Sequence, residues 1–282
     1  MKDITKREYR NEDFDKVFQF MIKTYAIDWK NGVPAPFFEY AQVLPWTERE
    51  RNHRNAIWEE DDEIVGFCFF ESSMGHAFFN IKEGYDTIIP DMIDHAEKHL
   101  CGKDGSLELK LFSGQKNVIK VAEQKGYQQI SESKQLIYSY CDGPLDYILP
   151  DGFYFEEPCK IDLEKQLDAT WQGFGNKSER PKSNHSPTEF GSIKGMDVVV
   201  KNEQDEYVCC ASMYFIPENK LAYLEPLATI EKYRNRGIAS AALSELYKRT
   251  RRLGATHMTG GYNKFYYDLG FNPVVVWTTW KK

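Results

Sequence analysis

Two arginines and a glycine stand where a long helical pattern begins in the second half of the sequence. The stretch EKYRNRGIASAALSELYKRT covers residues 231–250, and Arg234, Arg236 and Gly237 precede a group of small residues. The free N–H groups of a helix start and the positive end of its dipole attract anions. A glycine lets a large anion approach the backbone, and arginines add charge-assisted contacts. The pattern predicts a phosphate or diphosphate site, with a capped surface helix and solvated arginines as the alternative.

The elements around this stretch must form a sheet that holds the helix start in place. Strand candidates GMDVVVKN, EYVCCASMYFI and KLAYLEPLAT are separated by the turns NEQDE and PENK, which predicts an antiparallel meander. A helix over 162–174 precedes them, with Asp162 as its N-cap. The meander is followed by the helix of the anion site, the strand ATHMTG, a short helix and the strand FNPVVVWTTW. This order predicts a mixed α/β layered sheet.

The helix over 162–174 and the helix of the anion site each show a spacing of apolar residues that predicts which face is buried. Gly254 is expected to end the second helix. The residues expected to face the core are Leu163, Leu167, Trp171 and Phe174 in the first helix, and Ala239, Ala242, Leu243, Leu246 and Leu253 in the second.

The first half of the sequence repeats this order of elements. Its ending VAEQKGY matches the later FYYDLGF, and Gly126 and Gly270 lie roughly 144 residues apart, a spacing that indicates an internal duplication. The join falls near CDGPLDYILPDG at 141–152, where glycines and prolines cluster. We therefore expect an α/β (α+β mixed sheet) protein of two tandem domains, one over residues 1–142 and the other over 150–282.

The anion-site stretch resembles a motif of a known family. LATIEKYRNRGIASAAL is similar to the acetyl-CoA motif of the GNAT N-acetyltransferase superfamily, Arg/Gln-x-x-Gly-x-Gly/Ala, with Arg234, Gly237 and Ala239 in register. NKFYYDLGF is similar to the second motif of the family, which Asn263, Tyr266, Gly270 and Phe271 match. The resemblance covers about residues 195–275, and the first half resembles the fold only in element order. The chain looks like a tandem GNAT protein whose first domain is degenerate.

The resemblance implies acetyl-CoA as the donor and a set of residues that would bind it. Backbone N–H groups of residues 236–240 would hold the diphosphate, and the strand 227–229 would pair with the pantetheine arm. The same strand would offer a donor to the thioester oxygen. The implied cofactor-binding residues are Leu227, Ala228, Thr229, Arg234, Asn235, Arg236, Gly237, Ile238, Ala239, Ser240, Asn263 and Tyr266.

The resemblance also implies two residues for proton transfer. Tyr266 would protonate the departing thiolate, since a phenol with a pKa near ~10 keeps its proton at neutral pH. A tyrosine packed between Phe265 and Tyr267 is the alternative. Glu225 lies two residues before Leu227 on one strand, so both side chains share a face. It is the candidate base, with a solvated or hydrogen-bonded carboxylate, or a water chain as the base, left open.

The first half lacks the features of the anion site. Asp86 replaces Arg234 in the comparison, Ala122 replaces Tyr266, and bulky residues crowd the helix start. We expect no acetyl-CoA there, and instead a role in packing and in shaping the acceptor side of the cleft. The segment WKNGVPAPFFEYAQVLPWTERER is expected to pack as core and loop, with a pocket cover as the alternative. The crowding residues are Ile88, Ile89 and Pro90.

Composition and charge limit the other readings. A chain of 282 residues with 41% hydrophobic and 28% charged residues is globular, and its net charge of −7 argues against a nucleic-acid surface. Six cysteines without CxxC spacing indicate a reduced, cytoplasmic protein, and no apolar run reaches ~20 residues, so we expect no membrane partner. His95 and His99 lie four residues apart without a third ligand, so we expect no metal and place both on a solvated helix face.

Three functions remain open. The first is an acetyl-CoA-dependent N-acetyltransferase acting on a primary amine of a small molecule or peptide. The second is a transferase that uses another acyl donor on the same fold. The third is a non-catalytic CoA-binding sensor or interaction module. The acceptor and the oligomeric state, including a homodimer, cannot be read from the sequence.

Overall fold

The chain divides into two compact units that do not coincide with its sequence halves. The computed structural model describes residues 3–44, 46–181 and 196–282. The first unit holds the described residues up to Gln135 together with Pro273–Lys282, and the second holds the described residues of 136–182 and 193–272. The predicted halves, 1–142 and 150–282, therefore differ from the compact units in where the last strand of each half belongs.

The first unit is a mixed sheet with helices on it. Its strand order is β1-β2-β3-β4-β5-β12, antiparallel except for the parallel pair β4–β5. The stretch EEDDE joins β2 to β3 in an antiparallel hairpin. The elements are β1 (Thr5–Glu8), α1 (Phe14–Thr24), α2 (Ala35–Val43), β2 (Ala56–Glu60), β3 (Glu63–Phe69), β4 (His76–Ile81), α3 (Ile89–His99), β5 (Glu108–Phe112), α4 (Lys116–Gln124) and β12 (Asn272–Lys281).

The second unit contains the predicted meander. Its strand order is β6-β11-β10-β9-β8-β7, and only the pair β10–β11 is parallel among the pairings β7–β8, β8–β9, β9–β10, β10–β11 and β6–β11. The elements are the end of β6 (Gln128–Ser139), β7 (Phe153–Phe155), α5 (Leu163–Gly173), β8 (Met196–Asn202), β9 (Tyr207–Ile216), β10 (Leu221–Thr229), α6 (Ile238–Arg252), β11 (His257–Thr259) and α7 (Lys264–Asp268).

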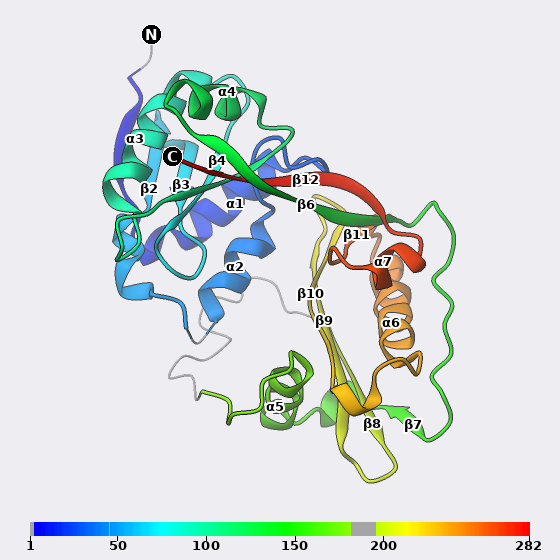
Figure 1. Ribbon diagram of the computed structural model, residues 1–282. Helices are drawn as coiled ribbons and strands as arrows, with labels where there is room; N and C mark the ends of the chain where they lie inside the picture. The colour runs from blue at the N-terminus through cyan, green and yellow to red at the C-terminus, as the bar shows by residue number, and fades with distance from the viewer. Residues whose placement is uncertain (1–2, 45, 182–195) are drawn as a thin grey trace. The chain divides into compact units, whose positions relative to one another are not determined.

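The helices α5 and α6 cover opposite faces of the meander (Figure 1). Cys209 and Cys210 follow each other on β9, so their side chains point to opposite faces. Cys209 lies in the large core beneath α6, while Cys210 lies in a smaller cluster with Ala169 of α5. Each cysteine is therefore buried in a different core, and the two side chains cannot form a joint site.

The predicted buried face of α5 is wrong. Its N-cap is as expected, since the Asp162 carboxylate accepts a hydrogen bond from the Lys165 backbone N–H at 3.1 Å. However, Leu163 is 50% exposed, and the buried positions of the helix are on another face. The helix lies so close to β10 that a Cβ on Gly173 would be 2.8 Å from the Ala228 Cβ. Small residues at the contact allow this close approach. The spacing of apolar residues in the sequence does not indicate how closely a helix approaches the sheet. The buried residues are Gln166, Ala169 and Gly173.

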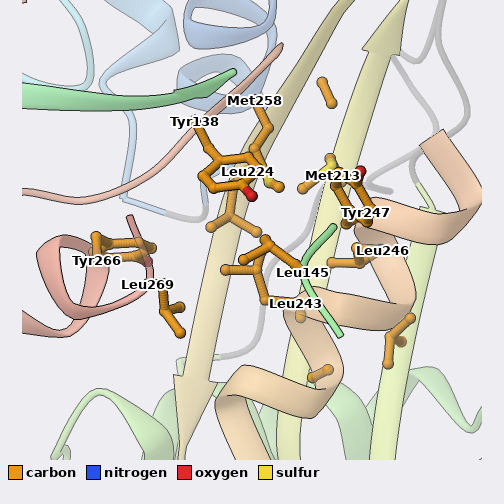
Figure 2. Close-up of a cluster of buried hydrophobic side chains, with 14 of the residues drawn as sticks. Tyr138, Leu145, Met213, Leu224, Leu243, Leu246, Tyr247, Met258, Tyr266 and Leu269 are labelled. Carbon is orange, nitrogen blue, oxygen red and sulfur yellow. The ribbon is translucent and has the colours of Figure 1, made fainter. Parts of the chain in front are cut away.

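The predicted buried face of α6 is largely confirmed. Ala242, Leu243 and Leu246 are buried against β8, β9 and β10, in the core that Figure 2 shows. Leu253 is 57% exposed, contrary to the prediction, because it follows the last turn of the helix and no longer lies over the sheet. Gly254 has φ +97° and comes directly after the C-cap, as expected for a helix stop.

The predicted exposure of His95 is also wrong. Its side chain is buried on α3, and Nε2 lies 2.8 Å from the Arg54 carbonyl oxygen. Burial lowers the pKa of His95 to about 4, so the ring is neutral at pH 7. The ring stacks on His99 with centroids 4.5 Å apart. In the part of the chain that the structure describes, no group of three or more His, Cys, Asp or Glu side chains could hold a metal ion.

The aromatic segment that follows α1 packs mainly as core. In α2, Phe38 is fully buried and Phe37 is 6% exposed, and their rings contact those of Phe67, Phe69 and Phe78. The prediction of core and loop is confirmed for the described residues of this segment. None of the described helices is long and apolar enough to cross a membrane.

Candidate active site

The start of α6 has the geometry of an anion site. Gly237 is the N-cap residue with φ +80°, a left-handed conformation that favours glycine. A Cβ placed there would meet only the Pro150 Cγ, at 4.0 Å, so space is open in front of the backbone. The first bond of the helix runs from the Ala241 N–H to the Gly237 carbonyl at 3.0 Å. The N–H groups of residues 238–240 therefore precede the helical ladder and can bind a diphosphate.

The edge of β10 opens beside this helix start. In the described residues, β10 pairs with β11 only at Leu221 and Ala222, although the strand continues to Thr229. On its other side, β10 pairs with β9, with a register shift between residues 224 and 227. The two neighbouring strands β10 and β11 thus diverge, and backbone groups of the later part of β10 face the gap.

The alternation of the ladder decides which groups face that gap. The Ile230 N–H donates to the Val208 carbonyl of β9 at 3.0 Å. Because hydrogen-bonding direction alternates along an antiparallel strand, Ala228 also points its backbone groups toward β9. Leu227 and Thr229 point theirs toward the open side. Of the three predicted pantetheine-pairing residues, Leu227 and Thr229 thus have backbone groups on the open side, where the Thr229 carbonyl already accepts a hydrogen bond from Arg234 Nε at 3.0 Å.

A threonine fixes the point of divergence. The Leu224 N–H donates to Thr259 Oγ1 at 2.9 Å, and Thr259 on β11 is 1% exposed. The hydroxyl takes the place of a strand carbonyl and holds the two strands at this separation. Sequence reasoning missed Thr259, and a lone threonine in a short apolar strand gives no signal of such a role.

The two arginines of the motif differ in their contacts. Arg234 donates from Nε to the Thr229 carbonyl at 3.0 Å and from a terminal nitrogen to the Gly173 carbonyl at 2.7 Å. It therefore ties the end of β10 to the end of α5. The exposed Arg236 donates to the Lys232 carbonyl at 3.2 Å, and its guanidinium lies 5.6 Å from the Tyr233 ring centroid. Arg236 and the neighbouring Asn235, which has φ +60°, stand on the solvent side of the loop.

Tyr266 lies in an aromatic cluster next to the open strand edge. It is 8% exposed, and the rings of Phe265 and Phe271 have their centroids 5.1 and 5.2 Å away. Burial raises the pKa of Tyr266 well above its ordinary value, and the negative charge of Glu225 raises it further. A backbone hydrogen bond at Gly261 acts in the opposite direction. The structure thus brings the two predicted proton-transfer residues within electrostatic reach of each other.

Two glycines make room for the Tyr266 ring. A Cβ on Gly260 would lie 2.7 Å from the Tyr266 Cδ1, and one on Gly261 would lie 2.6 Å from its Cε2. Asn263 follows as the exposed N-cap residue of α7, and its carbonyl accepts the Tyr266 N–H at 3.2 Å. Sequence reasoning missed the glycines, although a Gly-Gly pair between a strand and a helix is a signal of close approach.

The first unit has the same strand divergence, but its own chain closes it. In the described residues, β4 pairs with β5 only at His76 and Ala77. Beyond that point, the buried Gln115 donates from Nε2 to the Phe79 carbonyl at 2.8 Å and accepts the Phe112 N–H at 3.1 Å. The sequence comparison of the two halves did not reveal this bridge between the strands.

A loop before α2 covers the edge of β4. The Ile81 N–H donates to the Asn31 carbonyl at 2.8 Å, and the Asn80 side chain exchanges hydrogen bonds with the Val33 backbone at 2.8 and 3.2 Å. Ile89 of α3, where the second unit has an open helix start, is 1% exposed and lies in the core. The backbone groups that β10 leaves open are therefore occupied along β4.

Comparisons with known proteins give the context of this geometry. The profile of the Acetyltransferase (GNAT) family matches residues 164–271, which include α5 to α7. No curated protein matches the sequence.

Solved structures resemble the chain over nearly its whole length. A tandem GNAT protein from the clavulanic acid biosynthesis pathway has a TM-score of 0.61 at 9% identity, covering 99% of this chain and 98% of its own. A GCN5-related N-acetyltransferase from Sphaerobacter thermophilus has a TM-score of 0.57 at 13% identity, covering 99% and 95%. A GNAT family acetyltransferase from Colwellia psychrerythraea has a TM-score of 0.57 at 11% identity, covering 99% of each chain. These likenesses confirm the predicted fold class.

Proposed function

From the premise that this chain has a tandem GNAT fold, with a GNAT acetyltransferase domain at residues 164–271, we propose that it is an acetyl-CoA-dependent N-acetyltransferase. In this proposal, the halves 1–142 and 150–282 are copies of one fold, and the second half is the catalytic one. The observation that carries the proposal is the open start of α6 beside the open edge of β10. Acyl transfer needs a donor held at its diphosphate and aligned along its arm, and these two features supply both.

Different residues of the second unit bind different parts of the donor. The N–H groups of Ile238, Ala239 and Ser240 bind the diphosphate at the helix start, where Gly237 leaves the approach clear. Leu227 and Thr229 pair with the pantetheine arm as an added strand would. Arg234 does not contact the donor in this proposal. Its hydrogen bonds to two carbonyls fix the loop that carries these N–H groups. Asn263 and Arg236 are exposed beside the site and complete the proposed binding set.

The chemistry needs one proton to leave the amine and one to reach the sulfur. When bound, acetyl-CoA supplies the activated acetyl group as a thioester. A primary amine has a pKa of about 10.4 and must lose a proton before it attacks, and Glu225 accepts that proton directly or through water. Tyr266 holds the proton for the thiolate, since its raised pKa keeps the phenol protonated at neutral pH. The Leu227 N–H is the candidate donor to the acyl oxygen.

The first unit takes no part in donor binding in this proposal. Gln115 bridges the diverging strands and Asn31 caps the edge of β4, so an arm of pantetheine would have to displace protein hydrogen bonds. Buried bonds of this kind cost about 1–3 kcal/mol each when a partner is left unpaired. One donor molecule per chain is the expected stoichiometry.

The acceptor in this proposal is a primary amine on a small molecule or a peptide. We place the protein in the cytoplasm, since all six cysteines are free thiols, as is usual in a reducing compartment. The burial of Tyr266 favours one second candidate, a CoA-binding module without catalysis, because a hydroxyl packed among aromatic rings does not need to act on a substrate.

The release of free thiol from acetyl-CoA, measured across a panel of amines and peptides, tests the proposal. We expect amine-dependent thiol release and a product that is heavier by one acetyl group. Propionyl-CoA and longer donors in the same assay identify a different acyl donor if they turn over faster. Tight binding of acetyl-CoA without turnover on any amine would favour the binding module over the transferase.

A further inference from the structure

The first unit contains a cavity that lies outside the closed gap between β4 and β5. The cavity has a volume of about 370 Å³, within the usual range of small-molecule sites. None of the residues that bridge β4 and β5 line it, so it is separate from the closed gap. The lining comprises Glu71, His76, Phe78, Lys110, Trp277 and Thr279, together with residues 131–133.

One wall of the cavity carries a carboxyl group in a poor environment for its charge. Burial raises the pKa of Glu71, and the positive charge of Lys110 acts in the opposite direction. Lys110 is already engaged, since its Nζ lies 2.7 Å from Glu108 Oε2 and 3.2 Å from Thr279 Oγ1. A cation that entered the cavity would therefore stabilise the ionised form of Glu71, because a desolvated carboxylate needs a paired charge.

Aromatic side chains form another part of the wall. Phe78 is 1% exposed, and its ring lies edge-on to that of Trp277 with centroids 5.6 Å apart. Aromatic faces attract an ammonium group within ~6 Å of the ring centroid, most strongly when water is excluded. Together with Glu71, they favour an organic amine over a hydrated metal ion.

The remaining polar groups suit an anionic group on the same ligand. Lys110 has a side chain only 18% exposed and keeps one further N–H donor beyond its bonds to Glu108 and Thr279. Burial and the charge of Lys110 lower the pKa of His76, so at pH 7 its ring is neutral, and a backbone hydrogen bond at Ser73 already engages it. A carboxylate can accept from Lys110.

We propose that this cavity binds a small zwitterion of the free amino acid type. Its ammonium group pairs with Glu71 beside Trp277, and its carboxylate accepts a hydrogen bond from Lys110. A simple amine would leave Lys110 without its added partner, and a simple acid would leave Glu71 desolvated. The inference concerns residues of the first unit alone and does not depend on acetyl transfer in the second.

Titration calorimetry of the full chain with each of the common L-amino acids tests the inference. The tightest ligand is then compared with its matched amine and acid, which for L-leucine are 3-methylbutylamine and 4-methylpentanoic acid. We expect the amino acid to bind and each analogue to bind at least about tenfold more weakly, since one charge pair is lost. No heat with any amino acid up to ~10 mM, or equal affinity for an analogue, would overturn the inference.

Variants of the lining separate this cavity from other sites. Glu71→Gln keeps the shape of the side chain and removes its charge, so it is expected to weaken binding at least about tenfold. Glu123→Gln, on the exposed face of α4 in the same unit, is the matched control and is expected to leave affinity unchanged. Lys110→Met is a second variant for use if Glu71→Gln does not fold.

Binding must also survive a change in the second unit. The variant Gly237→Glu, which blocks the proposed donor site, is expected to bind the amino acid as the wild type does. Loss of amino acid binding in that variant, or unchanged affinity in Glu71→Gln, would place the ligand elsewhere and overturn the inference. Retained amino acid binding with no acetyl transfer would leave this site standing and count only against the proposed transferase.

Discussion

At the scale of single residues, Tyr266 has surroundings that fit a proton donor. Tyr266 is 8% exposed, and burial disfavours the phenolate, so the proton stays on oxygen at neutral pH. In the proposed reaction this proton is held beside the departing thiolate. The nearby Glu225 works in the same direction, because its negative charge also opposes ionisation of the phenol.

Replacing Tyr266 by Phe removes the proposed proton donor and little else. We expect kcat to fall by about 10²–10⁴, while the free energy of unfolding changes by only about 1 kcal/mol, since one hydrogen bond is lost. Steady-state thiol release measures the first and chemical denaturation the second. Tyr267→Phe, at a 43% exposed neighbour on α7, is the matched control and should keep its turnover. Full turnover in Tyr266→Phe would assign the proton transfer to another group.

The backbone conformation of the predicted anion motif could be read from the sequence, because a glycine at a helix start indicates a positive φ. Gly237 has the positive φ that its position in the motif demands, and nothing fills the space in front of it. The supporting residues Thr259 and Gln115 were not readable. Each forms a hydrogen bond with a strand that is distant in sequence, so no local pattern marks it.

At the scale of elements, α5 and β10 form one supporting structure. Apolar spacing predicted that α5 buries its leucines and Trp171, but the helix turns Gly173 and Ala169 to the sheet instead. The reason is distance, since only small residues permit the contact between Gly173 and Ala228. Hydrophobic periodicity reports which residues avoid water and not how closely two backbones approach. The strand order of the meander was predictable because its turns are short.

Arg234 links these two elements and can be tested apart from its charge. Arg234→Met should release the Gly173 and Thr229 carbonyls and weaken acetyl-CoA binding by at least about tenfold, with faster amide exchange at the end of α5. Arg236→Met, which removes the same charge from the same loop, should weaken binding less and leave exchange in α5 unchanged. Hydrogen exchange measures the change at the end of α5, and calorimetry measures the affinity for acetyl-CoA. Equal effects of the two variants would mean that Arg234 acts only as a charge.

At the scale of the whole molecule, the two halves of the chain contribute strands to each other's units. The last strand, β12, pairs with β5, and the end of β6 pairs with β11. The sequence predicted the existence and order of these strands, since both copies end in a β-rich segment. It could not predict their partners, because an unpaired final strand fits either copy of a duplicated fold equally well.

Replacing Trp280 tests which of the two units β12 stabilises. Its side chain is 6% exposed in the core of the first unit, so Trp280→Ala should cost about 3–5 kcal/mol there. Hydrogen exchange should quicken in β4 and β5 while β11 keeps its protection. Val274→Ala, at a 37% exposed position of the same strand, should change little. Faster exchange in β11 alone would contradict the observed pairing of β12.

The central claim is that one acetyl-CoA binds per chain at the start of α6, and titration calorimetry with two glycine variants tests it most directly. Gly237→Glu and Gly254→Glu place the same side chain at left-handed positions at opposite ends of α6, with φ +80° and +97°. Each carries a conformational cost of about 1–2 kcal/mol. We predict one site in the wild type, the same site in Gly254→Glu, and a loss of at least about a hundredfold in affinity in folded Gly237→Glu. Wild-type affinity in Gly237→Glu, or a second site in the wild type, would contradict the account.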